Sequence, residues 1–156
     1  MGKTLVIDTE KCTGCRVCEM VCAVKHAGVV NPLRSRIRII KSEWQGRYEP
    51  VACRQCKTPL CLSACPVEAI SRDETSNRVV IDDALCTGCR LCVTACPFGA
   101  MGFDPVDKKV IKCDLCDGDP QCVRFCETEA IRYIETSSEK PEGNPVSSKR
   151  QERNDC

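Results

Sequence analysis

Sixteen of the seventeen cysteines in this sequence fall into four groups of four, and the spacing within each group suits metal ligation. The first and third groups share the spacing Cys-x2-Cys-x2-Cys-x3-Cys. The second and fourth carry two and three further residues between their second and third cysteines, which widens a loop without removing a ligand. Thiolates in such a run are the ligands of [4Fe–4S] clusters in bacterial ferredoxins.

In this run the first three cysteines bind one cluster and the fourth binds a second cluster, so the groups must work in pairs. Nested and sequential pairings are both open, and the order of the expected strands favours the nested one. The first group then exchanges its fourth ligand with the fourth group, and the second group with the third. This hypothesis defines four cluster sites, each with four iron ligands. The ligands are Cys12, Cys15, Cys18 and Cys126 in site A; Cys113, Cys116, Cys122 and Cys22 in site B; Cys53, Cys56, Cys61 and Cys96 in site C; and Cys86, Cys89, Cys92 and Cys65 in site D.

Zinc and disulfides are the alternative uses of so many cysteines. Zinc tetrads usually pair two Cys-x2-Cys doublets and do not repeat the longer run found here. A disulfide framework requires an oxidising compartment and gives no reason for cysteines one helical turn apart. Cys156 lies outside the four groups, and we interpret it as an incidental exposed thiol. His26 is the only histidine; since every group is complete without it, we expect it at a helix end near the first group.

The Cys-x3-Cys spacing places two cysteines about one helical turn apart, which predicts a short helix in each group. The expected helices cover residues 18–26, 61–65, 92–96 and 122–126. The preceding Cys-x2-Cys segments are expected to be tight loops around a cluster. Gly14 and Gly88 suit such loops because glycine accepts unusual backbone dihedrals.

Short strands are expected between the cysteine groups. Residues 36–39 alternate polar and apolar side chains, which is typical of a half-buried strand. The predicted pairs are residues 36–39 with 47–51, 70–72 with 78–81, 102–104 with 109–111, and 5–7 with 131–134. The sequence thus predicts an α+β chain in which residues 1–30 and 109–135 form one module and residues 31–108 form a second, inserted module. Residues 136–156 are polar, and we expect a flexible or partner-binding tail.

Composition agrees with a fold that is organised by metal. Without cysteine, the share of hydrophobic residues falls from 42% to about 31%, so a conventional core would be thin. Metal ligation can compensate, because its binding free energy becomes folding free energy. The 23 lysines and arginines balance 22 aspartates and glutamates, which gives no case for nucleic acid or an anionic membrane surface. We see no secretory signal, no twin-arginine leader and no membrane span, so the expected location is the cytoplasm.

The four motifs in this order, with x4 in the second group and x5 in the fourth, resemble the iron–sulfur electron-transfer subunits of molybdenum and tungsten oxidoreductases. Dimethyl sulfoxide reductase and formate dehydrogenase subunits belong to that family. The resemblance implies two nested bacterial-ferredoxin-like modules around four [4Fe–4S] clusters. It also implies that single electrons pass along the clusters between a catalytic subunit and another carrier. The chain carries no nucleophile–base pair and no nucleotide-binding loop, so we expect no catalysis by the chain itself.

Among these subunits, the sequence is most similar to the small ferredoxin-like subunit of bacterial tungsten aldehyde oxidoreductases. The expected partner is a large catalytic subunit that holds a tungsten or molybdenum cofactor, with a flavin-containing subunit as a further candidate. The alternatives are a free-standing polyferredoxin, or the equivalent subunit of a benzoyl-CoA reductase or formate dehydrogenase type complex. Head-to-tail self-association through the tail is a separate hypothesis. We expect no direct membrane insertion, because the chain lacks the extensions that dock a membrane anchor in longer relatives.

Overall fold

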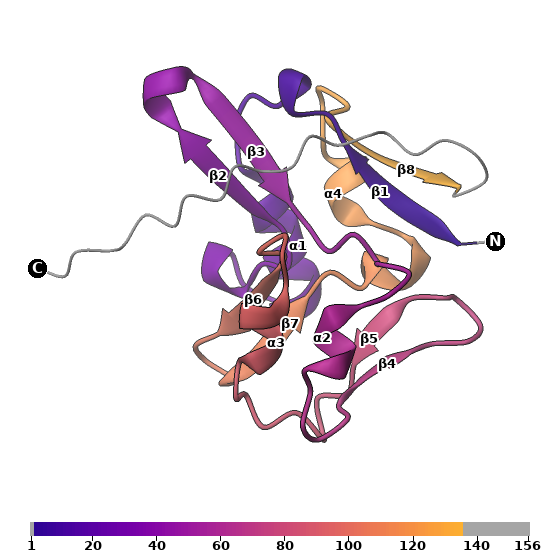
Figure 1. The fold of residues 1–156 in the computed structure, drawn as a ribbon. Helices are drawn as coiled ribbons and strands as arrows, with labels where there is room; N and C mark the ends of the chain where they lie inside the picture. The colour runs from indigo at the N-terminus through magenta and orange to yellow at the C-terminus, as the bar shows by residue number, and fades with distance from the viewer. Residues whose placement is uncertain (1, 136–156) are drawn as a thin grey trace, which may run out of the picture.

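The computed structural model describes residues 2–135, and this part of the chain holds four two-stranded antiparallel sheets. Each sheet is small, and short helices and loops separate the sheets (Figure 1). The strand pairs are β1 (Lys3–Ile7) with β8 (Ile131–Glu135), β2 (Arg38–Ser42) with β3 (Arg47–Val51), β4 (Ile70–Arg72) with β5 (Val79–Ile81), and β6 (Met101–Asp104) with β7 (Lys109–Lys112).

The pairing of β1 with β8 joins the two ends of the described chain, as the sequence predicts. Ile7 lies opposite Ile131 and Lys3 opposite Glu135, so the register runs through all five residues of each strand. In Figure 1 the indigo strand β1 lies beside the yellow strand β8. The predicted pairs around residues 70–81 and 102–111 are also confirmed, with strand ends that differ by one residue.

Four α-helices lie in the described part of the chain, one in each cysteine group. They are α1 (Val17–Ala27), α2 (Leu60–Ser63), α3 (Leu91–Ala95) and α4 (Gln121–Arg124). Single 3-10 turns add η1 (Thr9–Lys11), η2 (Pro32–Arg34), η3 (Glu43–Gln45) and η4 (Leu115–Gly118). Helix α1 lies against α4 and helix α2 lies against α3, so the helices meet in two separate pairs.

The ends of the short helices differ from the prediction. Helices α2, α3 and α4 all end before the fourth cysteine of their group. In α3 a proline contributes, because a residue before proline avoids the α-helical region and Cys96, which precedes Pro97, has φ −76° and ψ 111°. Helix α1 instead continues through its fourth cysteine, Cys22, until Gly28 caps it in a left-handed conformation.

The strand expected at residues 36–39 begins later, at Arg38, and extends to Ser42. Ser35 is the reason: its hydroxyl donates to the carbonyl of Ile37 at 2.6 Å and accepts from the Ile37 amide at 3.2 Å. Such local side-chain hydrogen bonds compete with a strand ladder. Ile37 nevertheless points inward and is 1% exposed.

Buried side chains form two hydrophobic cores that mix cysteine with aliphatic residues. The outer core contains Cys18, Cys22, Ile37, Ile39, Ala52, Cys113, Leu115, Cys122 and Ile131. The inner core contains Ile70, Val79, Cys92, Met101 and Val110. Ile37, Ile39 and Ala52 flank the β2–β3 hairpin, so this hairpin packs with the outer core although the sequence places it in the inserted module. Both cores are thin, as the composition predicts.

Within residues 2–135, no helix has the length and apolar character that a membrane span requires. The predicted tail and Cys156 lie outside the described residues.

An ion pair attaches the turn η2 to the β6–β7 hairpin. The Arg34 Nε donates to Asp104 Oδ2 at 2.7 Å, and the two side chains are 13% and 6% exposed. Burial alone would raise the pKa of Asp104, but Arg34 and the amides of Val106 and Asp107 outweigh it and lower the pKa. Because the folded-state pKa is depressed, the pair stabilises the fold above the ordinary aspartate pKa, and this contribution is lost as the pH falls through the folded-state pKa.

We therefore expect Asp104→Asn to lower the free energy of unfolding at pH 7, because it leaves the less exposed side of the Arg34 guanidinium beside a neutral amide, with only the exposed Asp107 as a counter-charge. The loss should shrink as the pH falls below about 4. Anaerobic denaturant unfolding between pH 7 and about pH 3 measures both. Asp107→Asn is the matched control: Asp107 pairs with the same Arg34 but is 62% exposed, so its loss should stay below about 1 kcal/mol. Equal losses in the two variants would contradict the account.

Candidate iron–sulfur cluster sites

The four predicted ligands of site D line one cavity. Cys65 comes from the end of the second group, and Cys86, Cys89 and Cys92 come from the third. Ile70 and other apolar residues complete the lining, and about 310 Å³ around these residues is free of protein atoms. Three cysteines of one group and the last cysteine of another therefore share one cavity.

The four predicted ligands of site C line a second cavity. Cys53, Cys56 and Cys61 belong to the second group, and Cys96 is the last cysteine of the third. The walls include Val79, Phe98 and Met101 together with Pro59 and Pro97. Here the second group contributes three cysteines and the third group contributes one, the reverse of the first cavity.

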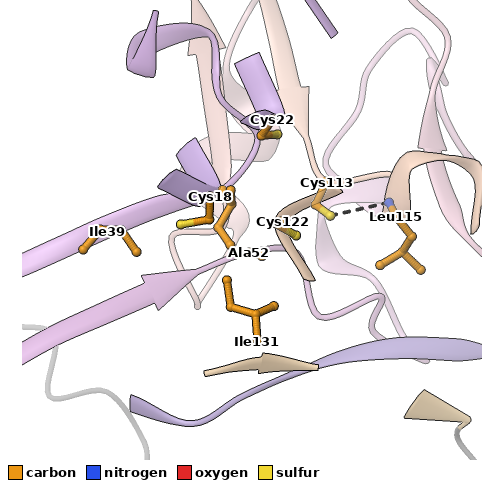
Figure 2. Close-up of a cluster of buried hydrophobic side chains, with 9 residues drawn as sticks. Cys18, Cys22, Ile39, Ala52, Cys113, Leu115, Cys122 and Ile131 are labelled. Carbon is orange, nitrogen blue, oxygen red and sulfur yellow. Dashed lines mark hydrogen bonds between the residues drawn. The ribbon is translucent and has the colours of Figure 1, made fainter. Parts of the chain in front are cut away.

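The cysteines of sites A and B meet where α1 faces α4. Figure 2 shows Cys18 and Cys22 on α1, with Cys113 and Cys122 on the facing segments. Cys113, Cys22, Cys116 and, more weakly, Cys18 act electrostatically on Cys122, and Cys15 and Cys12 act on Cys18. The two sets of cysteines are therefore close neighbours in this region.

The fourth ligand of site A lies at the edge of the outer core. Cys12 and Cys126 are both partly buried and both pack against that core. The Cys126 sulfur also lies 3.7 Å from the Thr128 hydroxyl. The predicted ligands of site A thus come from three segments. Cys12 and Cys15 lie between η1 and α1, Cys18 lies in α1, and Cys126 lies between α4 and β8.

Burial raises the free energy of the thiolate form of these cysteines relative to the thiol. It raises the pKa of Cys18 and Cys113 to about 12 and that of Cys92 to about 11, and it raises the pKa of Cys122 further. Neighbouring thiolates add to the rise, because like charges repel. A coordinating metal reverses this balance, since it deprotonates its thiol ligands outright. A soft, all-thiolate donor set of four in an apolar setting fits iron–sulfur ligation.

All four cluster loops share one backbone feature. The residue just before the second cysteine has a left-handed conformation in each group: Gly14 at φ 70°, Gln55 at 49°, Gly88 at 72° and Leu115 at 62°. A Cβ atom on Gly88 would lie 2.4 Å from the carbonyl oxygen of Lys108, so this position also requires the space. The sequence signalled the two glycines but not the other two positions.

Backbone amides donate to several cysteine sulfurs. The amide of Ala69 donates to Cys65 at 3.3 Å and that of Leu115 to Cys113 at 3.5 Å, the latter drawn in Figure 2. The amide of Arg36, two residues before β2 begins, donates to the Cys22 sulfur at 3.3 Å. Hydrogen bonds to ligand sulfurs are one of the means by which proteins set cluster potentials.

His26 lies in the last turn of α1, one turn after Cys22 of the first group, where a helix end is expected. Its ring also contacts the fourth group, which the sequence did not indicate: Nε2 lies 3.5 Å from the Cys116 sulfur and 3.5 Å from Asp114 Oδ1. The reason is that the last turn of α1 faces the η4 loop. Burial lowers the pKa of His26, and the nearby Arg36 guanidinium lowers it further.

Two polar side chains that the motifs did not signal meet at the Cys113 carbonyl of the fourth group. Gln55 donates from Nε2 to the Cys113 carbonyl at 2.8 Å and accepts the Val79 amide at 2.8 Å. Lys112 is buried and donates to the same Cys113 carbonyl at 3.0 Å. Gln55 is distant in sequence from Cys113, and Lys112 from Val79, to whose carbonyl it also donates, so only the folded chain shows these contacts.

Comparison with known proteins identifies the domain type. The family model of the 4Fe–4S dicluster domain matches residues 44–136, and that of a 4Fe–4S binding domain matches residues 4–29. The polyferredoxin-like subunit of the aliphatic sulfonate oxidoreductase of Pyrococcus furiosus is 36% identical over 122 residues, which cover 78% of this chain and 70% of that subunit. The putative electron transport protein YsaA of Escherichia coli is 40% identical over 148 residues, covering 86% and 91% of the two chains.

A solved structure agrees with these relatives. A chain of the active-site complex BamBC of benzoyl-coenzyme A reductase with 1,5-dienoyl-CoA is 28% identical, with a TM-score of 0.53. The match covers 91% of this chain and 80% of that one. The predicted resemblance to ferredoxin-type iron–sulfur proteins is therefore confirmed at this level. The chain belongs to the 4Fe–4S dicluster domain family of iron–sulfur proteins.

Proposed function

We propose that this protein is an electron-relay subunit that holds four [4Fe–4S] clusters in sites A to D, with the sixteen grouped cysteines as their ligands. The observation that carries the proposal is the lining of the two cavities. Each is lined by four cysteines, three from one group and the last from another. Ferredoxin-type ligation requires this combination, and zinc doublets do not.

The nested arrangement of two bacterial-ferredoxin-like modules belongs to this proposal. It is supported by the pairing of β1 with β8, which brings the first and fourth groups together, and by the packing of α1 on α4 and α2 on α3. The predicted bounds are residues 1–30 and 109–135 for one module and residues 31–108 for the inserted one, with the β2–β3 hairpin of the inserted segment packed on the outer core.

The exposure of the cysteines supports a path with two surface ends. Site A contains the exposed Cys15 and site D contains the exposed Cys89, whereas all four cysteines of site B are buried. Sites B and C adjoin, because Cys53 acts electrostatically on Cys113. The order A, B, C, D follows, with electrons entering and leaving at A and D. When bound, each cluster takes up and releases one electron, and the chain contributes spacing, hydrogen bonds to sulfur and exclusion of water.

The partner in this proposal is a large catalytic subunit with a tungsten or molybdenum cofactor, of the aldehyde oxidoreductase type. Similarity to the polyferredoxin-like subunit of an oxidoreductase supports a partner of this kind. A flavin-containing subunit is a candidate for the other end of the relay. The likeness to a chain of the BamBC complex favours a second candidate, the equivalent subunit of a benzoyl-CoA reductase type complex.

Replacement of Cys22 tests the shared ligand. In the reduced protein, Cys22→Ser should lose the same EPR component as Cys122→Ser, because both remove a ligand of site B. Cys18→Ser is the control, and it should lose a different component, that of site A. Iron content should fall by about four atoms or fewer in each variant. If Cys22→Ser instead matches Cys18→Ser, the nested assignment is wrong.

Purification with the native partner tests the relay. A tagged full-length chain, isolated anaerobically from its own cell, should carry a larger subunit through size exclusion, and metal analysis should find tungsten or molybdenum in that fraction. Identification of the large subunit by mass spectrometry then separates an aldehyde oxidoreductase from a benzoyl-CoA reductase type. A chain that elutes alone with its clusters intact would support a free polyferredoxin.

A further inference from the structure

Lys112 is a buried cation at the place where the second and fourth cysteine groups meet. It is the last residue of β7 and directly precedes Cys113, and it is only 3% exposed. Its ammonium donates to the carbonyls of Val79 and Cys113, the latter at 3.0 Å. Neutral carbonyls satisfy its hydrogen bonds but do not balance its charge.

No carboxylate balances that charge within residues 2–135, since none of the ion pairs there includes Lys112. An unpaired buried ammonium is costly, because the charge leaves water without a counter-charge. The thiols around it are the nearest candidates. The ammonium is close enough to Cys61 for its charge to favour the thiolate of that residue.

The position of Lys112 lies between sites B and C. The carbonyl of Cys113, a predicted ligand of site B, accepts from both Lys112 and Gln55. Gln55 stands in the loop between Cys53 and Cys56, two predicted ligands of site C, and also binds β5 through the Val79 amide. The ammonium therefore sits in a hydrogen-bonded junction that both sites share.

We propose that the Lys112 ammonium raises the reduction potentials of the clusters at this junction, sites B and C, and so eases electron transfer between the two modules. The inference rests on the proposed function. A [4Fe–4S] core with four thiolates is anionic, and reduction adds one more negative charge. A fixed cation in a region of low dielectric stabilises the reduced state more than the oxidised state. The anionic clusters in turn supply the counter-charge that Lys112 lacks among the carboxylates.

Redox titration of the full-length, cluster-loaded chain, followed by EPR, tests this role. In Lys112→Met, the ratio of reduced to oxidised cluster at a fixed ambient potential should fall about tenfold at the junction, a shift of about 59 mV for a one-electron couple. The shifted component should be one that Cys122→Ser or Cys61→Ser removes. Lys112→Arg keeps the charge and should stay within about twofold of the unsubstituted protein.

Lys109→Met is the matched control, because Lys109 lies on the same strand but donates to the Asp83 carbonyl at the surface. Water and salt screen a charge there, so its removal should leave every potential within about twofold. Unchanged potentials in Lys112→Met would overturn the proposal. Loss of iron from both Lys112→Met and Lys112→Gln would also overturn it, because Lys112 would then be required to retain the clusters and would not only set their potentials. Absence of clusters from the unsubstituted chain would instead overturn the proposed function.

Discussion

In the proposed assignment, the exchange of the fourth cysteine between groups is the constraint on which the rest of the structure depends. The helices that carry cysteines in groups two to four have only four or five residues, far below the length at which an isolated helix is stable. The sheets have two strands each, and an isolated hairpin is marginal in water. The two cores contain few large aliphatic side chains. A ligand that crosses from one group to another compensates, because metal binding contributes directly to folding free energy.

In that assignment, the same exchange explains why segments far apart in the sequence lie together. Strand β1 pairs with β8 and α1 lies against α4, so the first and fourth groups face each other across the outer core. Helices α2 and α3 do the same around the inner core. The junction between the two cores is polar, with Gln55 and Lys112 meeting at the Cys113 carbonyl. Apolar packing thus surrounds each pair of sites, and hydrogen bonds connect the pairs.

The sequence predicted much of the fold because the cysteine spacing is itself helical and the strands alternate or carry β-branched residues. The pairs of β4 with β5, β6 with β7 and β1 with β8 followed from this pattern. Other features depended on neighbours that the pattern does not contain. Helices α2, α3 and α4 end before their fourth cysteine, and Ser35 delays β2 through its hydrogen bonds with Ile37. Leu115 takes a left-handed conformation with no glycine to signal it.

The residues of the candidate sites also fall into those that the sequence pattern indicated and those that it did not. The sixteen cysteines follow from spacing, and their assignment to four clusters stays a prediction that the cavities support. His26 and Lys112 act through contacts with residues far away in the chain, so the motifs could not place them.

Iron and acid-labile sulfide, counted per chain in protein purified without oxygen, test the central claim most directly. Four [4Fe–4S] clusters predict about sixteen iron atoms and about sixteen sulfides per chain, with zinc close to absent. Stoichiometric zinc, or about eight irons with half of the grouped cysteines open to alkylation, would contradict it.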